Sequence, residues 1–265
     1  MSYVVYSTSK QSDVQLTMSS AMQTDLPDLS TGEKAALLEA AEAVVMGNTV
    51  AALPTAYQHL TTIPNGVIAV LREDGEFRGV AWAQEENLYR SVQAAVAQAL
   101  AEEYSKISNK DQVYVHLFVF GPEKELDKEF ELGLHGVHMR SSSAEIYIRP
   151  SFQTERNYDA EKYWEVLCDQ IDMKAGCQST SAAHTTYAPV LHFGQSRDKS
   201  RVVDFYRGKE LESFAPITRD TLLALQQPAE QRLLDNVKTA GDITYVYNPS
   251  NGTYSDNNNM IRQLM

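Results

Sequence analysis

The stretch from Asn65 to Trp82 constrains the fold more than any other part of this 265-residue chain. Val67–Leu71 is a run of apolar, largely β-branched residues, which is typical of a buried strand. Asp74-Gly75 follows and predicts a tight turn, because glycine accepts the positive φ that such a turn requires. Phe77–Trp82 then predicts a returning strand, so the stretch is a β-hairpin.

Gly79 interrupts the second strand of this hairpin, directly after Arg78. A glycine inside a strand predicts either a bulge or the close approach of another group to the backbone. Arg78 is therefore either a binding residue for a carboxylate or phosphate beside exposed N–H groups, or a surface arginine next to a bulge. Trp82 is either a core aromatic residue or a stacking wall for a ligand.

Composition limits the classes of partner. The formal net charge is -12, which argues against general affinity for nucleic acids or anionic membranes. The two cysteines, Cys168 and Cys177, are too few for a disulfide framework or an all-cysteine zinc site. There is no apolar run near the ~20 residues of a membrane span, and no signal-peptide pattern. We expect a reduced, cytoplasmic protein.

Hydrophobic periodicity predicts the remaining elements. Helices are expected over 30–46, 86–104, 159–173 and, broken near Pro228, 218–238, with a short solvated helix over 123–131. Strands are expected over 113–120, 133–139, 144–149, 190–193, 202–206 and 242–247, and a loop over 54–64. Without a steady β-α-β alternation, this order indicates an α+β fold with a mostly antiparallel sheet and helices packed on one face.

Four short motifs follow one another along the chain: Gly66–Leu71 with Gly75–Gly79, Leu134–Val137, Ile146–Pro150, and Tyr158–Glu161 leading to Leu167-Cys168. In this order they resemble the AMMECR family. The resemblance covers roughly residues 30–206 and implies an α+β domain of two subdomains with a cleft between them. The family's biochemical activity is unsettled, although its members occur beside or fused to a dioxygenase-like protein and a radical-SAM protein.

The chain departs from the family at Val80-Ala81-Trp82, where relatives carry Cys-Ile-Gly. A mechanism that uses this cysteine is therefore absent here. Residues 1–29 are expected to be strands and a linker, and residues 207–265 a helical extension. Three segments near the end, Tyr245–Pro249, Tyr254–Asp256 and Asn259–Gln263, are similar to the entry of an α/α-toroid domain, and Met260–Met265 is similar to the first turns of an amphipathic helix. This predicts a larger protein, of which the chain is the N-terminal part.

His135 is the candidate catalytic residue. It lies between glycines and is either a general base with a near-neutral pKa or a histidine tied to the backbone. His138 follows three residues later, so the two histidines are expected on opposite faces of a strand. Cys168, on an apolar helix face, is expected in the core rather than as a nucleophile. A metal site is not expected, because no helix carries two histidines at metal-binding spacing.

Two functional hypotheses follow. The first is a binding module for a small anionic ligand or a protein partner, with neither metal nor cofactor. Its predicted binding residues are Arg78, Gly79, Trp82, Gly136 and Arg149. The alternative is an enzyme whose cleft uses Arg78 and His135 on a small anionic substrate.

Overall fold

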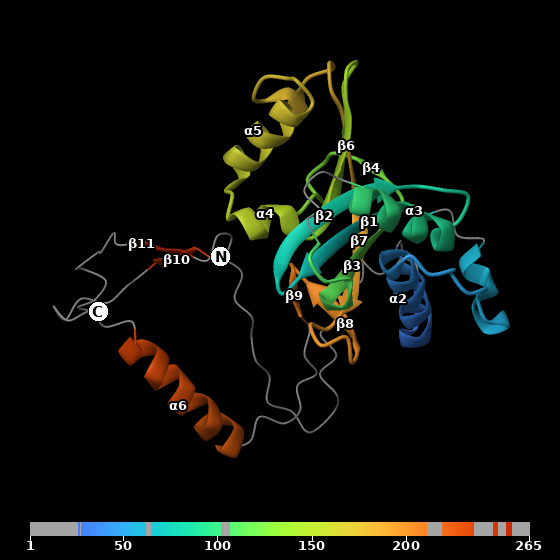
Figure 1. The fold of residues 1–265 in the computed structure, drawn as a ribbon. Helices are drawn as coiled ribbons and strands as arrows, with labels where there is room; N and C mark the ends of the chain where they lie inside the picture. The colour runs from blue at the N-terminus through green and yellow to red at the C-terminus, as the bar shows by residue number, and fades with distance from the viewer. Residues whose placement is uncertain are drawn as a thin grey trace, which may run out of the picture.

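The computed structural model describes residues 26, 28–61, 65–101, 107–210, 219–235, 246–248 and 253–255. It confirms the expected α+β fold with an antiparallel sheet (Figure 1). The predicted strands near the N-terminus lie outside these ranges, and of the C-terminal entry segment only 246–248 and 253–255 are described.

One curled sheet of nine strands organises the described residues. Its main path runs β2-β1-β3-β7-β5-β6, and every pairing is antiparallel. Three short strands, β4, β8 and β9, attach at its edges through β7 and β8. The strands are β1 Val67–Glu73, β2 Glu76–Ala83, β3 Val113–Phe120, β4 Lys124–Glu125, β5 His135–Arg140, β6 Glu145–Ile148, β7 His184–Gln195, β8 Val202–Tyr206 and β9 Lys209–Glu210.

The predicted hairpin is confirmed in β1 and β2. Asp74 and Gly75 form its turn with positive φ angles of 52° and 87°. The register shifts so that Leu71 pairs with Gly79 and Arg72 with Phe77, which leaves Arg78 as the extra residue of a β-bulge.

Helices α2 (Thr31–Met46) and α3 (Leu88–Ala101) cover the outer face of β1 and β3. Ser30 and Glu33 form the predicted capping box at the start of α2, and Gly47 ends the helix in the left-handed conformation. The α3 backbone comes close to β2, because a Cβ on Gly79 would lie 2.3 Å from the carbonyl oxygen of Ala99. The close approach predicted for Gly79 is therefore confirmed, and the bulge lies at the preceding residue, Arg78.

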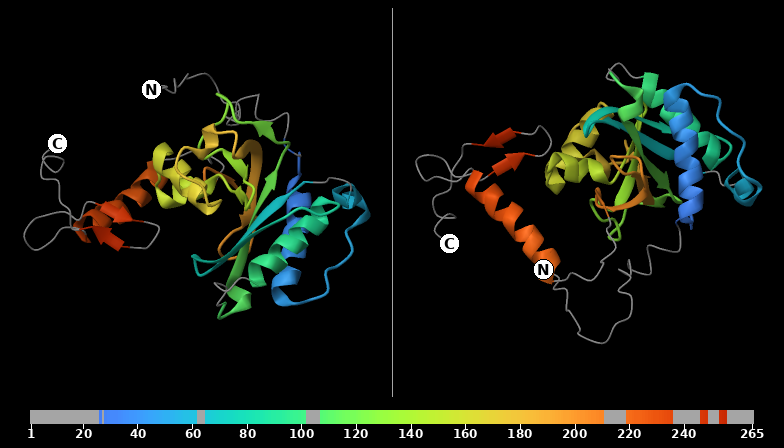
Figure 2. Two further views of the ribbon diagram at one scale, coloured as in Figure 1. Left: turned by 90° about the horizontal axis from the view of Figure 1, so that it is seen from above. Right: turned by 60° about the horizontal axis from the view of Figure 1, so that its bottom comes forward.

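A second outer cluster packs around α5 (Ala160–Gln170), which Asp159 caps as predicted. The strand register places Val137 and Met139 of β5 on the same sheet face as the contacts of α2 and α3. Because the sheet is curled, the two groups of helices pack on the same outer face but at different places around it (Figure 2).

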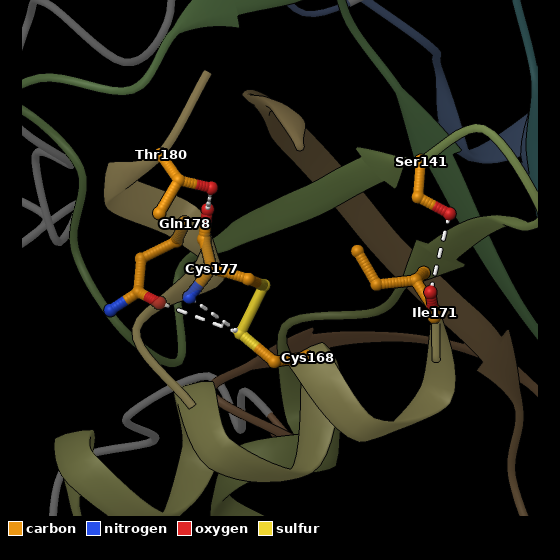
Figure 3. Close-up of a disulfide and its surroundings, with 6 residues drawn as sticks. All are labelled: Ser141, Cys168, Ile171, Cys177, Gln178 and Thr180. Atoms are coloured by element: carbon orange, nitrogen blue, oxygen red, sulfur yellow. Dashed lines mark hydrogen bonds between the residues drawn. A yellow bond between two sulfur atoms is a disulfide. The ribbon is translucent and has the colours of Figure 1, made fainter. Parts of the chain in front are cut away.

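Cys168 and Cys177 form a disulfide inside this second cluster (Figure 3). The core location expected for Cys168 is confirmed, since its side chain is fully buried. The expectation that the cysteines stay reduced is wrong, because the turn after α5 brings the two residues together. Composition could not show this pairing.

The inner face of the sheet carries a third cluster, built from alternate residues of β1, β3 and β7. Its buried members are Ile68, Val70, Phe118, Phe120, Ala188 and Val190. The sheet is nearly closed, and aromatic rings from its first and last strands meet. Trp82 of β2 stacks on Tyr147 of β6, with ring centroids 3.7 Å apart.

Some local predictions were wrong. Residues 123–131 form strand β4 and turns instead of a helix, because Lys124 and Glu125 pair with β7. The 54–64 segment contains the 3-10 helix η1 (Thr55–Thr61). Helix α6 (Arg219–Asp235) continues through Pro228. The other short elements are η2 Lys110–Gln112, α4 Ser151–Arg156, η3 Cys177–Ser179, β10 Val246–Asn248 and β11 Thr253–Ser255.

Candidate functional site

The structure separates the predicted site residues. Trp82, Gly136 and Arg149 belong to the inner side of the sheet, where Gly136 faces Phe120 and Arg149 follows β6. His135 belongs to the outer face, one residue before Gly136. The six predicted residues therefore do not form one cleft.

Arg78 is held by two carboxylates of its own hairpin. Its Nε lies 2.8 Å from Oε2 of Glu73, and its Nη1 lies 3.1 Å from Oε2 of Glu76. Glu73 is only 1% exposed and also accepts hydrogen bonds from Ser108 and Asn109. Those bonds from Ser108 and Asn109, with a contribution from Arg78, lower the pKa of Glu73 to about 2. Arg78 is thus part of an ionic lock between the hairpin and the chain after α3.

The two predicted binding glycines are packing positions. A Cβ on Gly136 would lie 2.3 Å from the Phe120 ring and 2.8 Å from Val190. Gly79 is similarly closed by the α3 backbone. Neither glycine presents open backbone to a ligand.

His135 is buried and tied to the backbone, which was the structural alternative for this residue. Its Nδ1 accepts a hydrogen bond from the backbone N–H of Glu131 at 2.9 Å. The ring packs edge-on against Tyr187. Burial lowers the pKa of His135, so the imidazole is neutral at physiological pH.

A pocket of about 370 Å³ opens beside Trp82. Trp82 and Phe120 provide aromatic walls, and Asn65 and Gln84 provide amides. Glu123 is the only charged side chain among the described residues that line it. We call this space the Trp82 pocket. It combines apolar walls with one negative charge.

The Glu123 carboxylate is held in place by two neighbours. Oε2 lies 2.9 Å from Nδ1 of His138 and accepts a hydrogen bond of 2.6 Å from Oγ1 of Thr186. The other ring nitrogen of His138 lies 2.8 Å from Oε1 of Glu145. Although burial raises the pKa of Glu123, the hydrogen bonds from His138 and Thr186 lower it overall, so the group is ionised at neutral pH.

His138 also completes an aromatic stack. Its ring lies 4.1 Å from that of Tyr147, which in turn stacks on Trp82. The expected opposite orientation of His135 and His138 is confirmed, since His138 belongs to the inner side. The sequence singles out His138 but not its pairing with Glu145, because that pairing depends on the register of β5 and β6.

The far end of the inner face is basic. Arg72 Nη2 lies 3.2 Å from Oε1 of Glu155, and Arg149 Nη2 lies 2.7 Å from Oε2 of the same carboxylate. Arg149 is 9% exposed, and Phe77 and Phe152 lie 5.8 Å and 5.9 Å from its guanidinium. We call this group the arginine cluster.

The buried His192 and the half-buried His116 lie next to the arginine cluster. Nε2 of His192 lies 3.4 Å from Nδ1 of His116, and Phe205 packs against both rings. Burial, with the nearby charge of Arg72, lowers the pKa of His116 to about 4. Burial, with the charges of Arg149 and Arg72, also lowers the pKa of His192. Both imidazoles are therefore neutral at physiological pH.

Nowhere in the described ranges do three or more His, Cys, Asp or Glu side chains gather as a metal-binding group. No helix in those same ranges is long and apolar enough to cross a membrane.

Comparisons with known proteins inform the fold alone. No family model matches the chain, and no curated protein matches it. Among solved structures, the chain is similar to the uncharacterized protein PH0010 from Pyrococcus horikoshii, with a TM-score of 0.55 and 12% identity. The similarity covers 66% of this chain and 96% of that one. At this identity the likeness extends to the arrangement of elements and not to a site.

Proposed function

We propose that this chain is a divergent AMMECR-like domain that acts as a binding module, with the Trp82 pocket as its ligand site. The motif order supports the family proposal, since the four motifs fall on the β1–β2 hairpin, the start of β5, β6 and the start of α5. Where relatives carry Cys-Ile-Gly, this chain has Val80-Ala81-Trp82. The indole of Trp82, which takes the place of the glycine, lines the pocket.

One observation carries the site proposal: an ionised, hydrogen-bonded carboxylate lines a pocket with two aromatic walls. Glu123 is held by His138 and Thr186, so no side-chain ordering is needed when a ligand binds. A cation in this pocket gains ionic attraction to Glu123, and its apolar groups pack against the aromatic walls. The ligand class that fits the pocket is therefore a small amine or other organic cation.

The enzyme alternative finds no support in the contacts. Arg78 is paired with Glu73 and Glu76, and His135 is bonded to the Glu131 backbone. Each group is satisfied within the protein and belongs to a different strand.

The test uses Trp82 as its own reporter. The chain has two tryptophans, so Trp164→Phe leaves Trp82 as the only one. In this background, a panel of small amines, their neutral amide analogues and small carboxylates is titrated while Trp82 emission and the melting temperature are recorded. We expect saturable changes with amines and none with the carboxylates.

Two further variants separate pocket binding from general electrostatics. Glu123→Gln should weaken amine binding about tenfold or more, which corresponds to loss of one charge-assisted hydrogen bond. Glu125→Gln is the matched control, because this neighbouring glutamate is exposed and does not line the pocket. If no panel member binds, or if both variants weaken binding equally, the Trp82 pocket is not the ligand site.

We also propose a protein partner as a second kind of ligand for the module. A cytoplasmic location is retained as well, although the Cys168–Cys177 disulfide weighs against a reducing compartment.

A further inference from the structure

The arginine cluster resembles a carboxylate receptor with its ligand in place. The two oxygens of Glu155 are divided between two arginines, one oxygen to Arg72 and the other to Arg149. Each guanidinium thus contacts one oxygen through its Nη2, and charge-assisted bonds of this kind are the strong contacts by which arginines bind carboxylates. Here the carboxylate belongs to α4, a helix of only six residues.

The cluster has donor capacity and charge beyond what Glu155 uses. Nε of Arg149 is buried without a hydrogen-bond partner among the described residues, although the side chain is nine-tenths buried. Two guanidiniums face one carboxylate, and the adjacent His116 and His192 are neutral. One unit of positive charge is left over in a chain whose formal net charge is -12. An ion group built only for stability would be expected to satisfy every buried donor.

Glu155 is also accessible from outside. Its side chain is 31% exposed, whereas that of Arg149 is 10% exposed. A cavity of about 20 Å³, room for about one water molecule, lies beside Ser151 and His192. The Glu155 carboxylate lies between the two guanidiniums, so an incoming anion at this position needs the space that the carboxylate takes.

We propose that Arg72 and Arg149 form a binding site for the carboxylate group of a small organic anion, and that Glu155 is a built-in competitor for that site. The inference is independent of the Trp82 pocket, which shares none of these residues. The sequence predicted a small anionic ligand at Arg78. We assign that ligand instead to Arg72 and Arg149 on the inner face.

The test removes the competitor and keeps its size. Glu155→Gln is melted in sodium acetate and in sodium chloride at equal ionic strength and neutral pH. We expect acetate to stabilise this variant in a saturable way, at a half-effective concentration about tenfold or more below that of the unmodified protein. Adding Arg149→Gln to Glu155→Gln should abolish the acetate effect.

Controls distinguish the site from general salt effects. Glu161→Gln changes an exposed glutamate at the start of α5 and should respond to acetate as the unmodified protein does. If Glu155→Gln does not fold in chloride, the proposal requires that acetate restores folding. Glu155→Asp, which keeps the charge but shortens the side chain, should give an intermediate response.

The proposal is wrong if acetate acts equally on the unmodified protein and on Glu155→Gln, or if the double variant still responds. Phosphate serves as a second probe. A larger effect of phosphate than of acetate on Glu155→Gln would overturn the assignment to a carboxylate.

Discussion

The indole of Trp82 lies flat on the phenol ring of Tyr147, with centroids 3.7 Å apart and ring planes inclined by 4°. Trp82 belongs to β2 and Tyr147 to β6, the two ends of the strand path. The stack therefore joins strands that make no backbone pairing with each other in the described sheet, and its Trp82 ring lines the Trp82 pocket.

The first prediction concerns this contact. Trp82→Leu and Tyr147→Leu should each lower the free energy of unfolding, and together they should cost less than the sum of the single changes. Aromatic pairs are worth about 0.5–1.5 kcal/mol beyond their buried area, so a coupling energy in this range is expected from a double-mutant cycle in urea. Strictly additive costs would show that the stack does not link the ends of the sheet.

The second prediction concerns acid stability. Glu73 has a folded pKa of about 2, below the ordinary 4.5, because Ser108 and Asn109 donate to it and Arg78 pairs with it. The ionised Glu73 contributes fully to the free energy of unfolding above pH 4.5, and this contribution is lost as the pH falls toward about 2. Glu73→Gln lacks the contribution, so it should be less stable at neutral pH but should lose stability less steeply over this acid range.

Equilibrium unfolding as a function of pH checks this, with Glu76→Gln as the control. Glu76 also contacts Arg78, but its side chain is 71% exposed. Its removal should leave the acid slope almost unchanged. Parallel slopes for Glu73→Gln and the unmodified protein would refute the proposed role of the ionic lock.

The third prediction concerns the glycine in β2. Gly79→Ala places a methyl group 2.3 Å from the Ala99 carbonyl oxygen, and a backbone atom cannot rotate away. We expect a loss of about 1–3 kcal/mol, as for other overpacked sites, measured by urea unfolding. Ala81→Gly, on the same strand, is the comparison and should cost only about 0.5–1 kcal/mol. A neutral Gly79→Ala would mean that α3 can move off the sheet freely.

The fourth prediction concerns the disulfide. The bond between Cys168 and Cys177 closes a short loop, since the two residues are nine positions apart. Loop-closure entropy predicts that reduction lowers the free energy of unfolding by about 2–3 kcal/mol. Thermal melting with and without a thiol reductant, with alkylation and mass measurement to confirm the redox state, tests this. An unchanged melting temperature of the fully reduced protein would show that the buried cluster around α5 needs no covalent link.

Much of the fold was predictable because its signals are local. The β1–β2 turn follows from Asp74-Gly75, and the start of α2 follows from the Ser30–Glu33 capping box. Each depends on residues within a few positions of one another. The 123–131 prediction failed because β4 is set by pairing with β7, which lies some 60 residues later.

The sequence by itself determined the α+β class, the hairpin and the identity of several polar residues worth examining. Only the tertiary structure decided their roles. Arg78 is neutralised by Glu73 because the hairpin bulge turns it toward that carboxylate. Arg149, a minor element of the sequence argument, meets Arg72 and Glu155 because a curled sheet brings distant strands together. Charge pairing and burial depend on such long-range register, and a linear pattern does not contain it.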